Sequence, residues 1–265
     1  MDCRNVDRAL VEGGNQLQLV QDHLRSCDRC RSLARSLDSA RPQSSNEAAP
    51  SPERLRQIEQ NITSDLRAVR PMRPLGYFFA AFAGIFVLIV ALGAYRMGTF
   101  AISVMSPLQA AAILCALAAS AGLLAYSLVH QMTPGSRHRL SPQLLPAGIM
   151  VLLLLLTAGL FQIQHDPMFW SHGWFCLSAG APLALLAAVP FWFLLRRGVI
   201  LSPRMTGAAT GLLAGLVGTS VLEIHCPNLD VLHILTWHFG VALLGAMTGL
   251  GIGFLGELSA RRRQQ

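Results

Sequence analysis

Charged residues are scarce in this chain. Only 13% of its 265 residues are charged, while 52% are hydrophobic. Soluble globular domains usually carry about 25% charged residues. Lysine is absent, so all 21 basic residues are arginines. This composition excludes an ordinary soluble domain and favours a membrane protein.

Other missing features exclude further classes of protein. Residues 1–20 lack an apolar core behind a basic start, so we expect no signal peptide and a cytoplasmic N-terminal region. The pI of about 9.7 does not indicate nucleic-acid binding, because residues 1–73 hold 12 arginines and 10 acidic residues. No nucleophile paired with a base and no phosphate-binding glycine loop is found, which makes an enzyme the weakest reading.

Six apolar stretches are long enough, or nearly long enough, to cross a hydrocarbon core of about 30 Å. They are Leu75–Tyr95, Leu108–Leu128, Leu144–Phe161, Trp174–Leu195, Gly207–Ile224 and Val231–Leu255. The third stretch is the shortest. The sequence therefore predicts an all-α protein in which residues 74–260 form a six-helix transmembrane bundle.

The arginines predict the orientation of this bundle. They stand before the first span, in alternate loops and in the tail: Arg67, Arg70, Arg73, Arg137, Arg139, Arg196, Arg197, Arg204, Arg261, Arg262 and Arg263. The other loops contain only Arg96. Because loops rich in arginine stay in the cytoplasm, both termini are expected there, in a bacterial inner membrane.

The middle of the predicted spans lacks ionisable residues. Glu223 and Glu257 stand at span ends. Proton- and ion-coupled transporters usually place charges inside the bundle. This absence argues against the alternative function, a small-solute or metal transporter with a regulatory zinc domain. Glycines recur at four-residue spacing in the last two spans, a pattern typical of closely packed helices: Gly207, Gly211, Gly215, Gly245, Gly249 and Gly253.

The N-terminal region contains a set of metal-binding residue types. Cys3 is followed by His23, Cys27 and Cys30 in the pattern His-x3-Cys-x2-Cys. Zinc prefers four tetrahedral ligands drawn from thiolate and imidazole. The alternative is a group of ordinary reduced cysteines with an unrelated histidine, and a disulfide is disfavoured in a reducing compartment. Residues 1–40 are therefore predicted to form a small helical domain with a structural zinc ion.

Residues 1–40 also resemble the zinc-containing anti-sigma domain, through the same Cys…His-x3-Cys-x2-Cys ligands and the short-helix layout. The interval from Cys3 to His23 is at the short end for that family. The resemblance implies that zinc is the cofactor and that the partner is an extracytoplasmic-function sigma factor, kept away from RNA polymerase.

Residues 41–73 combine a polar linker with an amphipathic helix. Ser51-Pro52-Glu53 is a typical helix start, with an N-cap, a proline in the first turn and an acid near the positive end. An apolar stripe follows at spacings of three and four residues: Leu55, Ile58, Ile62, Leu66 and Val69. The pattern also fits a helix lying on the membrane or on the zinc domain. The anti-sigma resemblance implies instead that the stripe grips the sigma factor.

The membrane part is similar to the NrsF family, six-span membrane anti-sigma factors. The resemblance is carried by Cys176, by Leu195-Arg196-Arg197-Gly198, by Glu223-Ile224-His225-Cys226-Pro227 and by Trp237-His238. It covers about residues 70–260. Members of that family usually have a shorter N-terminal region without the zinc motif. This chain therefore looks like a fusion of a zinc-containing anti-sigma domain with an NrsF-like membrane domain. The resemblance implies a membrane-anchored anti-sigma factor that releases its partner on an envelope signal.

Two cysteines are predicted near the outer surface at similar depth, Cys176 and Cys226. In an oxidising compartment such a pair forms a disulfide, or binds a soft metal ion with His225 or His233 nearby. The alternative is that both thiols pack as small apolar groups, which is our interpretation of Cys115 inside the second span. Cys176, Cys226 and His225 are the candidate sensor residues.

Overall fold

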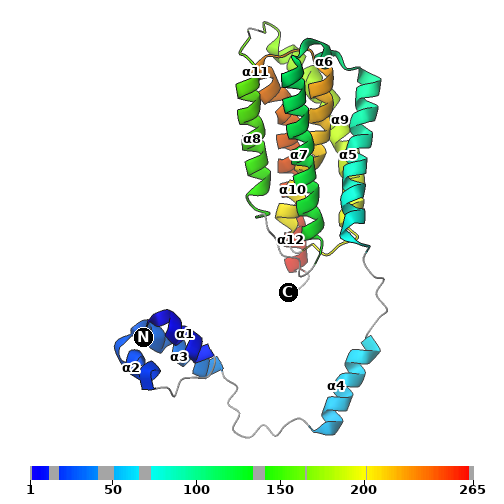
Figure 1. Cartoon of the computed structure of the whole chain (residues 1–265). Coiled ribbons are helices and arrows are strands. Elements are labelled where there is room, and N and C mark those ends of the chain that lie inside the picture. Colours follow the sequence, from blue (N-terminus) through cyan, green and yellow to red (C-terminus); the bar gives the residue numbers. More distant parts are fainter. Residues whose placement is uncertain are drawn as a thin grey trace. The chain divides into compact units, whose positions relative to one another are not determined.

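The computed structural model describes residues 2–11, 18–40, 51–65, 73–133, 141–164, 166–200 and 202–262. They fall into two compact units, Met1–Arg70 and Pro71–Gln265. Figure 1 shows that the described residues form helices and no strand. The predicted all-α class is confirmed.

The first unit contains three short helices, α1 (Cys3–Val11), α2 (Gln18–Ser26) and α3 (Asp28–Ala40). Among the described residues, four side chains form their buried centre: Val6, Leu10, Val20 and Cys30. An ion pair between Asp7 and Arg29, 3.0 Å long, joins α1 to α3 at the surface. A core this small contributes little to the stability of the fold, so a bound metal ion would stabilise this unit considerably.

A fourth helix, α4 (Pro52–Asp65), begins as the sequence predicts. The Ser51 hydroxyl accepts a hydrogen bond of 3.2 Å from the Arg54 backbone N–H, which caps the first turn. Three members of the apolar stripe are exposed on α4: Leu55, Ile58 and Ile62. Leu66 and Val69 lie outside the described residues.

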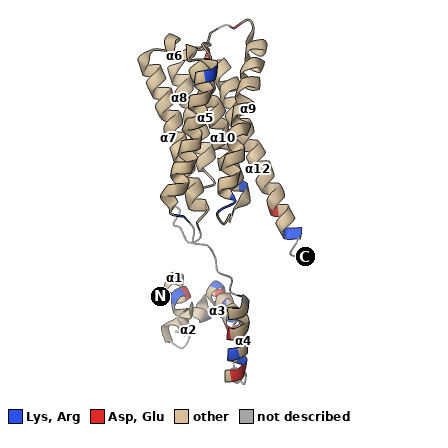
Figure 2. Cartoon of the chain, turned by 90° about the vertical axis from the view of Figure 1, so that its right-hand side faces the viewer, with Lys and Arg blue, Asp and Glu red and all other residues tan. Residues whose placement is uncertain are grey.

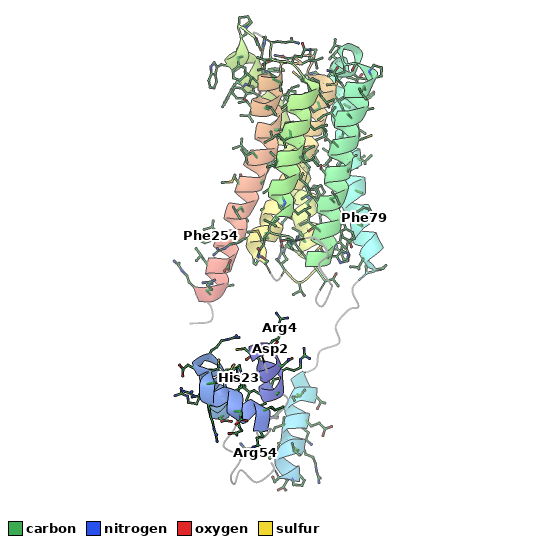
Figure 3. All side chains as sticks on the ribbon, turned by 60° about the vertical axis from the view of Figure 1, so that its left-hand side comes forward. Asp2, Arg4, His23, Arg54, Phe79 and Phe254 are labelled. Atoms are coloured by element: carbon green, nitrogen blue, oxygen red, sulfur yellow. The ribbon has the colours of Figure 1, made fainter. Side chains whose placement is uncertain are left out.

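The second unit is a bundle of long helices joined by short ones. Its elements are α5 (Leu75–Met97), α6 (Phe100–Val104), α7 (Pro107–Gln131), α8 (Leu145–Leu160), α9 (Phe169–Leu195), α10 (Pro203–His225), α11 (Val231–His233), the π-helix η1 (Ile234–His238) and α12 (Phe239–Arg262). Every predicted span coincides with helix. Large apolar side chains such as Phe79 and Phe254 are exposed on its outside, as expected for a surface in contact with lipid (Figure 3).

Within the part of the chain that the structure describes, five helical segments are long and apolar enough to cross a membrane: α5, α7, α9, α10 and the run Val231–Arg262. The third predicted span is shorter. Its helix, α8, has 16 residues and reaches about 24 Å at 1.5 Å per residue. It runs beside α7 (Figure 1), and its end is tied there because the Gln109 side chain donates a 2.7 Å hydrogen bond to the Leu160 carbonyl. The count of six spans stays a prediction.

Helix α10 is the most buried of the long helices and packs most closely on α12. The predicted role of the glycines is confirmed, because a Cβ at Gly207 or Gly211 would overlap the backbone oxygen of Gly249 or Gly245. Gly218 approaches α9 in the same way. Such contacts between backbones hold membrane helices at short distance without any side chain between them.

Charged side chains avoid the middle of the bundle, which is almost uniformly tan in Figure 2. The described arginines of this unit gather at the end where α5 begins and α9 and α12 finish: Arg73, Arg196, Arg197, Arg204, Arg261 and Arg262. Arg96 lies at the opposite end, in the last turn of α5. Cys115 is exposed on α7 rather than packed inside the bundle.

Candidate metal centres

The four predicted N-terminal ligands meet at one point. The Cys3 sulfur lies 3.5 Å from the His23 Nε2 atom and 3.8 Å from the Cys27 sulfur. One ligand atom from each of Cys3, His23, Cys27 and Cys30 lies within 4.8 Å of the others. Around a tetrahedral zinc ion, neighbouring sulfurs are about 3.8 Å apart, and a sulfur and a nitrogen about 3.6 Å. These residues therefore fit a zinc ion without rearrangement.

Local structure explains this convergence. His23 stands in the last turn of α2, Cys27 in the junction between α2 and α3, and Cys30 in the first turn of α3. Hydrogen bonding from the Cys30 backbone lowers the pKa of the Cys27 thiol to about 7, while burial raises the pKa of Cys30 to about 12. A bound cation would keep both thiols ionised, because metal binding displaces their protons.

A second cluster lies at the opposite end of the bundle from the gathered arginines. It joins Cys176 of α9, Cys226 just after α10, His233 of α11 and His238 of η1. The two sulfurs are 3.6 Å apart, and the His233 Nε2 atom lies 3.5 Å from Cys176 and 3.7 Å from Cys226. All four side chains are buried. Both cysteines are free thiols.

The third candidate sensor residue, His225, lies outside this cluster. Its ring contacts the ring of Phe100, with 5.6 Å between the centroids. The structure places His233 and His238 beside the thiols instead. The sequence pointed to His233 as a possible partner of the thiols and to His238 only through the family resemblance. Residues five apart in an α-helix point about 140° away from one another, so ordinary helical spacing does not bring these two histidines together.

A π-helical turn changes that geometry. In η1 the Phe239 backbone N–H donates a hydrogen bond to the Ile234 carbonyl, five residues earlier. An α-helix has this hydrogen bond between residues four apart, so the π-helical turn is wider. His233 and His238 therefore face the same point. A search for histidines at π-helical spacing next to Cys226 would have found the pair.

A carboxylate supports the ring of His238. The Nδ1 atom of His238 lies 3.0 Å from the Glu223 carboxylate, and both side chains are almost completely buried. Glu223, which the sequence analysis placed at a span end, is thus enclosed within the last turns of α10. A buried carboxylate is costly unless it is paired. In many metal sites, a histidine that binds the metal through one ring nitrogen is hydrogen-bonded to a carboxylate through the other.

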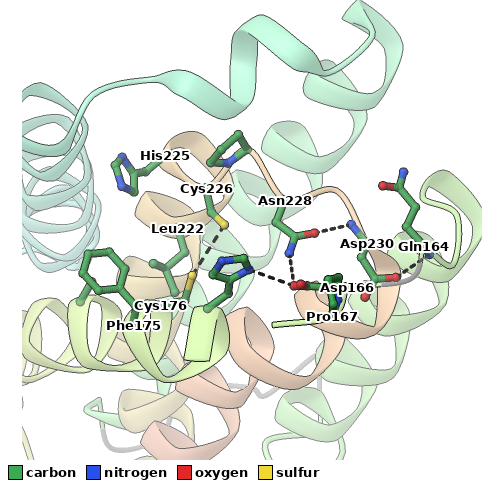
Figure 4. Close-up of a pocket in the computed structure, with 13 residues that line it drawn as sticks. Gln164, Asp166, Pro167, Phe175, Cys176, Leu222, His225, Cys226, Asn228 and Asp230 are labelled. Atoms are coloured by element: carbon green, nitrogen blue, oxygen red, sulfur yellow. Dashed lines mark hydrogen bonds and ion pairs between the residues drawn. The ribbon is translucent and has the colours of Figure 1, made fainter. Parts of the chain in front are cut away.

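A pocket of about 480 Å³ leads to the two thiols. Figure 4 shows Cys176 and Cys226 on one side of it and the polar residues Asp166, Asn228 and Asp230 on the other. Asp230 fixes the start of α11, because its carboxylate accepts hydrogen bonds from the backbone N–H groups of His233 (3.0 Å) and Gln164 (2.8 Å).

Asp166 adds a negative charge at the rim of this pocket. The Met168 backbone N–H and the nearby His172 ring lower the pKa of its carboxyl group. The Nδ1 atom of His172, in the first turns of α9, lies 3.2 Å from this carboxylate. The polar rim and the thiols together can attract and hold a cation.

Residues 62–255 match the family described as "NrsF: Negative regulator of sigma F". The chain belongs to this family. The matched region contains all four residues of the second cluster and none of the first. The N-terminal zinc domain therefore remains a prediction from ligand spacing and geometry.

A similar protein is the "Probable anti-sigma-F factor NrsF" of Azospira oryzae. It is 30% identical over 136 residues, which cover 48% of this chain and 62% of that protein. No solved structure matches the chain. The family is described by the regulation of a sigma factor and not by a reaction.

Proposed function

We propose that this protein is a membrane-anchored anti-sigma factor. It binds an extracytoplasmic-function sigma factor in the cytoplasm of a bacterium and releases it when an envelope signal reaches the membrane domain. Membership of the NrsF family over residues 62–255 carries this proposal. The name of the Azospira oryzae relative supports it.

The sigma factor binds residues 1–70 in this proposal. A zinc ion held by the N-terminal cluster stabilises α1 to α3, and the apolar stripe of α4 forms the surface that binds the sigma factor. Leu55, Ile58 and Ile62 are 52%, 47% and 58% exposed. Three large apolar side chains on one face of a polar helix are typical of a helix that docks into a partner's groove.

The membrane domain crosses the inner membrane six times, with both termini in the cytoplasm. The arginines at one end of the bundle support this orientation. Reporter fusions after residue 45 and at the C-terminus should both report a cytoplasmic location. Termini on opposite sides would mean that α8 does not cross the membrane.

The signal acts on Cys176 and Cys226 beside the outer pocket, which His225 also lines. Thiols that are reachable from an oxidising compartment respond to oxidants and to soft metal ions. Their 3.6 Å separation supports a joint response of both sulfurs.

Co-purification from bacterial membranes tests the anti-sigma function. The full chain should retain a sigma factor, and the double change Ile58→Asp and Ile62→Asp should reduce the amount at least about tenfold, because burying two charges at an apolar contact is costly. Zinc content should not change. Gln57→Asp adds charge to the opposite face of α4 and serves as the matched control. Absence of any sigma factor from the wild-type preparation would refute the function.

A further inference from the structure

We propose that Cys176, Cys226, His233 and His238 form a second zinc-type metal site, located inside the membrane domain and separate from the N-terminal cluster. The site would hold a thiol-binding divalent ion such as Zn²⁺ between α9, α10 and the π-helical turn. Metal binding at this site does not depend on the anti-sigma assignment.

The distances carry the first part of this inference. A tetrahedral zinc ion requires about 3.8 Å between two sulfurs and about 3.6 Å between a sulfur and an imidazole nitrogen. The measured separations are 3.6 Å between the sulfurs and 3.5 and 3.7 Å from the sulfurs to His233. A ligand atom of His238 completes the set within 4.8 Å. The spacing resembles that of the N-terminal cluster, which has a different sequence pattern.

Unpaired atoms carry the second part. Hydrogen bonds among thiols and His233 would account for three of the four residues. They leave the Nε2 atom of His238 without a hydrogen-bond partner, although this residue is 1% exposed. Because Glu223 engages the Nδ1 atom, Nε2 is the nitrogen left for a metal. An unpaired buried nitrogen is costly, and coordination would remove that cost.

Charge supports a dication at this place. Two thiolates and a divalent ion sum to zero, which suits a buried position at low dielectric. One carboxylate oxygen of Glu223 is also buried without a hydrogen-bond partner. A metal on the Nε2 atom of His238 would polarise the ring, and its Nδ1–H group would then donate a stronger hydrogen bond to the Glu223 carboxylate.

Two unusual backbone features support this arrangement. The π-helical turn of η1 aligns His233 with His238, and such turns are frequent at functional sites. Gly173 of α9 leaves room for the indole ring of Trp237, because a Cβ there would overlap it. The π-helical turn can therefore lie directly on α9, which brings His238 into the same cluster as Cys176.

Metal analysis of the full chain in detergent tests the proposal. In a Cys27→Ser, Cys30→Ser background the purified protein should retain about one Zn²⁺ per chain, and added Co²⁺ should give the spectrum of a tetrahedral ion with two thiolates. His238→Ala should remove the metal. Glu223→Gln should weaken Zn²⁺ binding about 10- to 100-fold without abolishing it. His225→Ala, at a half-buried neighbour outside the cluster, should have no effect.

A second variant, in which one metal ligand replaces another, tests whether metal loss in His238→Ala is caused by misfolding. His238→Cys should keep the metal and change the Co²⁺ spectrum to that of three thiolates. No zinc in the Cys27→Ser, Cys30→Ser protein, or full zinc content after His238→Ala, would overturn the proposal. Both measurements are made without a sigma factor, so a failed anti-sigma assignment would leave them unchanged.

Discussion

Removal of zinc is expected to unfold the N-terminal fragment of residues 1–72. The fragment should bind one zinc ion, lose most of its helical circular dichroism when a chelator is added, and regain it when zinc is restored. The physical reason is the small size of its core, which in the described part of the fragment consists of Val6, Leu10, Val20 and Cys30. Structural zinc supplies about 10–16 kcal/mol of apparent binding free energy to small domains, far more than such a core provides.

Single substitutions should reproduce this loss. Cys27→Ser or Cys30→Ser should abolish tight zinc binding. Cys3→Ser should weaken it less, because the other three cluster residues lie close together in the sequence, at the junction of α2 and α3. Ser32→Ala, at an exposed position of α3, is the matched control and should bind normally. An unchanged helical spectrum in the metal-free fragment would show that the domain folds without zinc.

Loss of Cys176 or Cys226 is expected to abolish induction of the sigma regulon. In cells that carry Cys176→Ser or Cys226→Ser, a reporter of the sigma regulon should stay at its uninduced level under thiol-oxidising or thiol-binding metal stress. A serine hydroxyl neither forms a disulfide nor binds a soft metal ion well. Basal repression should persist, because residues 1–70, which hold the proposed sigma-binding surface, are unaltered.

Cys115→Ser is the control for this experiment. This cysteine is exposed on α7 and belongs to neither cluster, so its replacement should leave induction intact. Immunoblots of membranes would establish equal amounts of each variant. Normal induction in both the Cys176→Ser and Cys226→Ser strains would exclude the sensor role while leaving the anti-sigma assignment standing.

Local signals were sufficient to predict most of this molecule. Hydropathy located every long helix because a membrane span must be apolar over its whole length. The spacing His-x3-Cys-x2-Cys located three ligands of the first cluster because it fits the junction of two short helices. Ser51 and Pro52 marked the start of α4 because capping depends on adjacent residues.

Features set by tertiary packing could not be predicted in this way. The role of His238 depends on one π-helical turn, which no periodicity in the sequence announces. Glu223 stands near a span end in the sequence, but α10 is enclosed by its neighbours even at that end. Hydropathy also does not decide whether α8, with its 16 residues, crosses the membrane alone or is merely carried by the helices around it.

The glycine contacts between α10 and α12 have a mechanical consequence. No side chain separates the two backbones at Gly207, Gly211 and Gly215, so no change of rotamer can absorb a displacement of one helix against the other. Cys226 follows the last residue of α10, while Arg204, near the start of this helix, is 2.6 Å from Glu257 of α12. The two helices thus form one stiff strut of about 35 Å. A displacement of α10 at Cys226 is therefore expected to move the end of the bundle where the arginines gather.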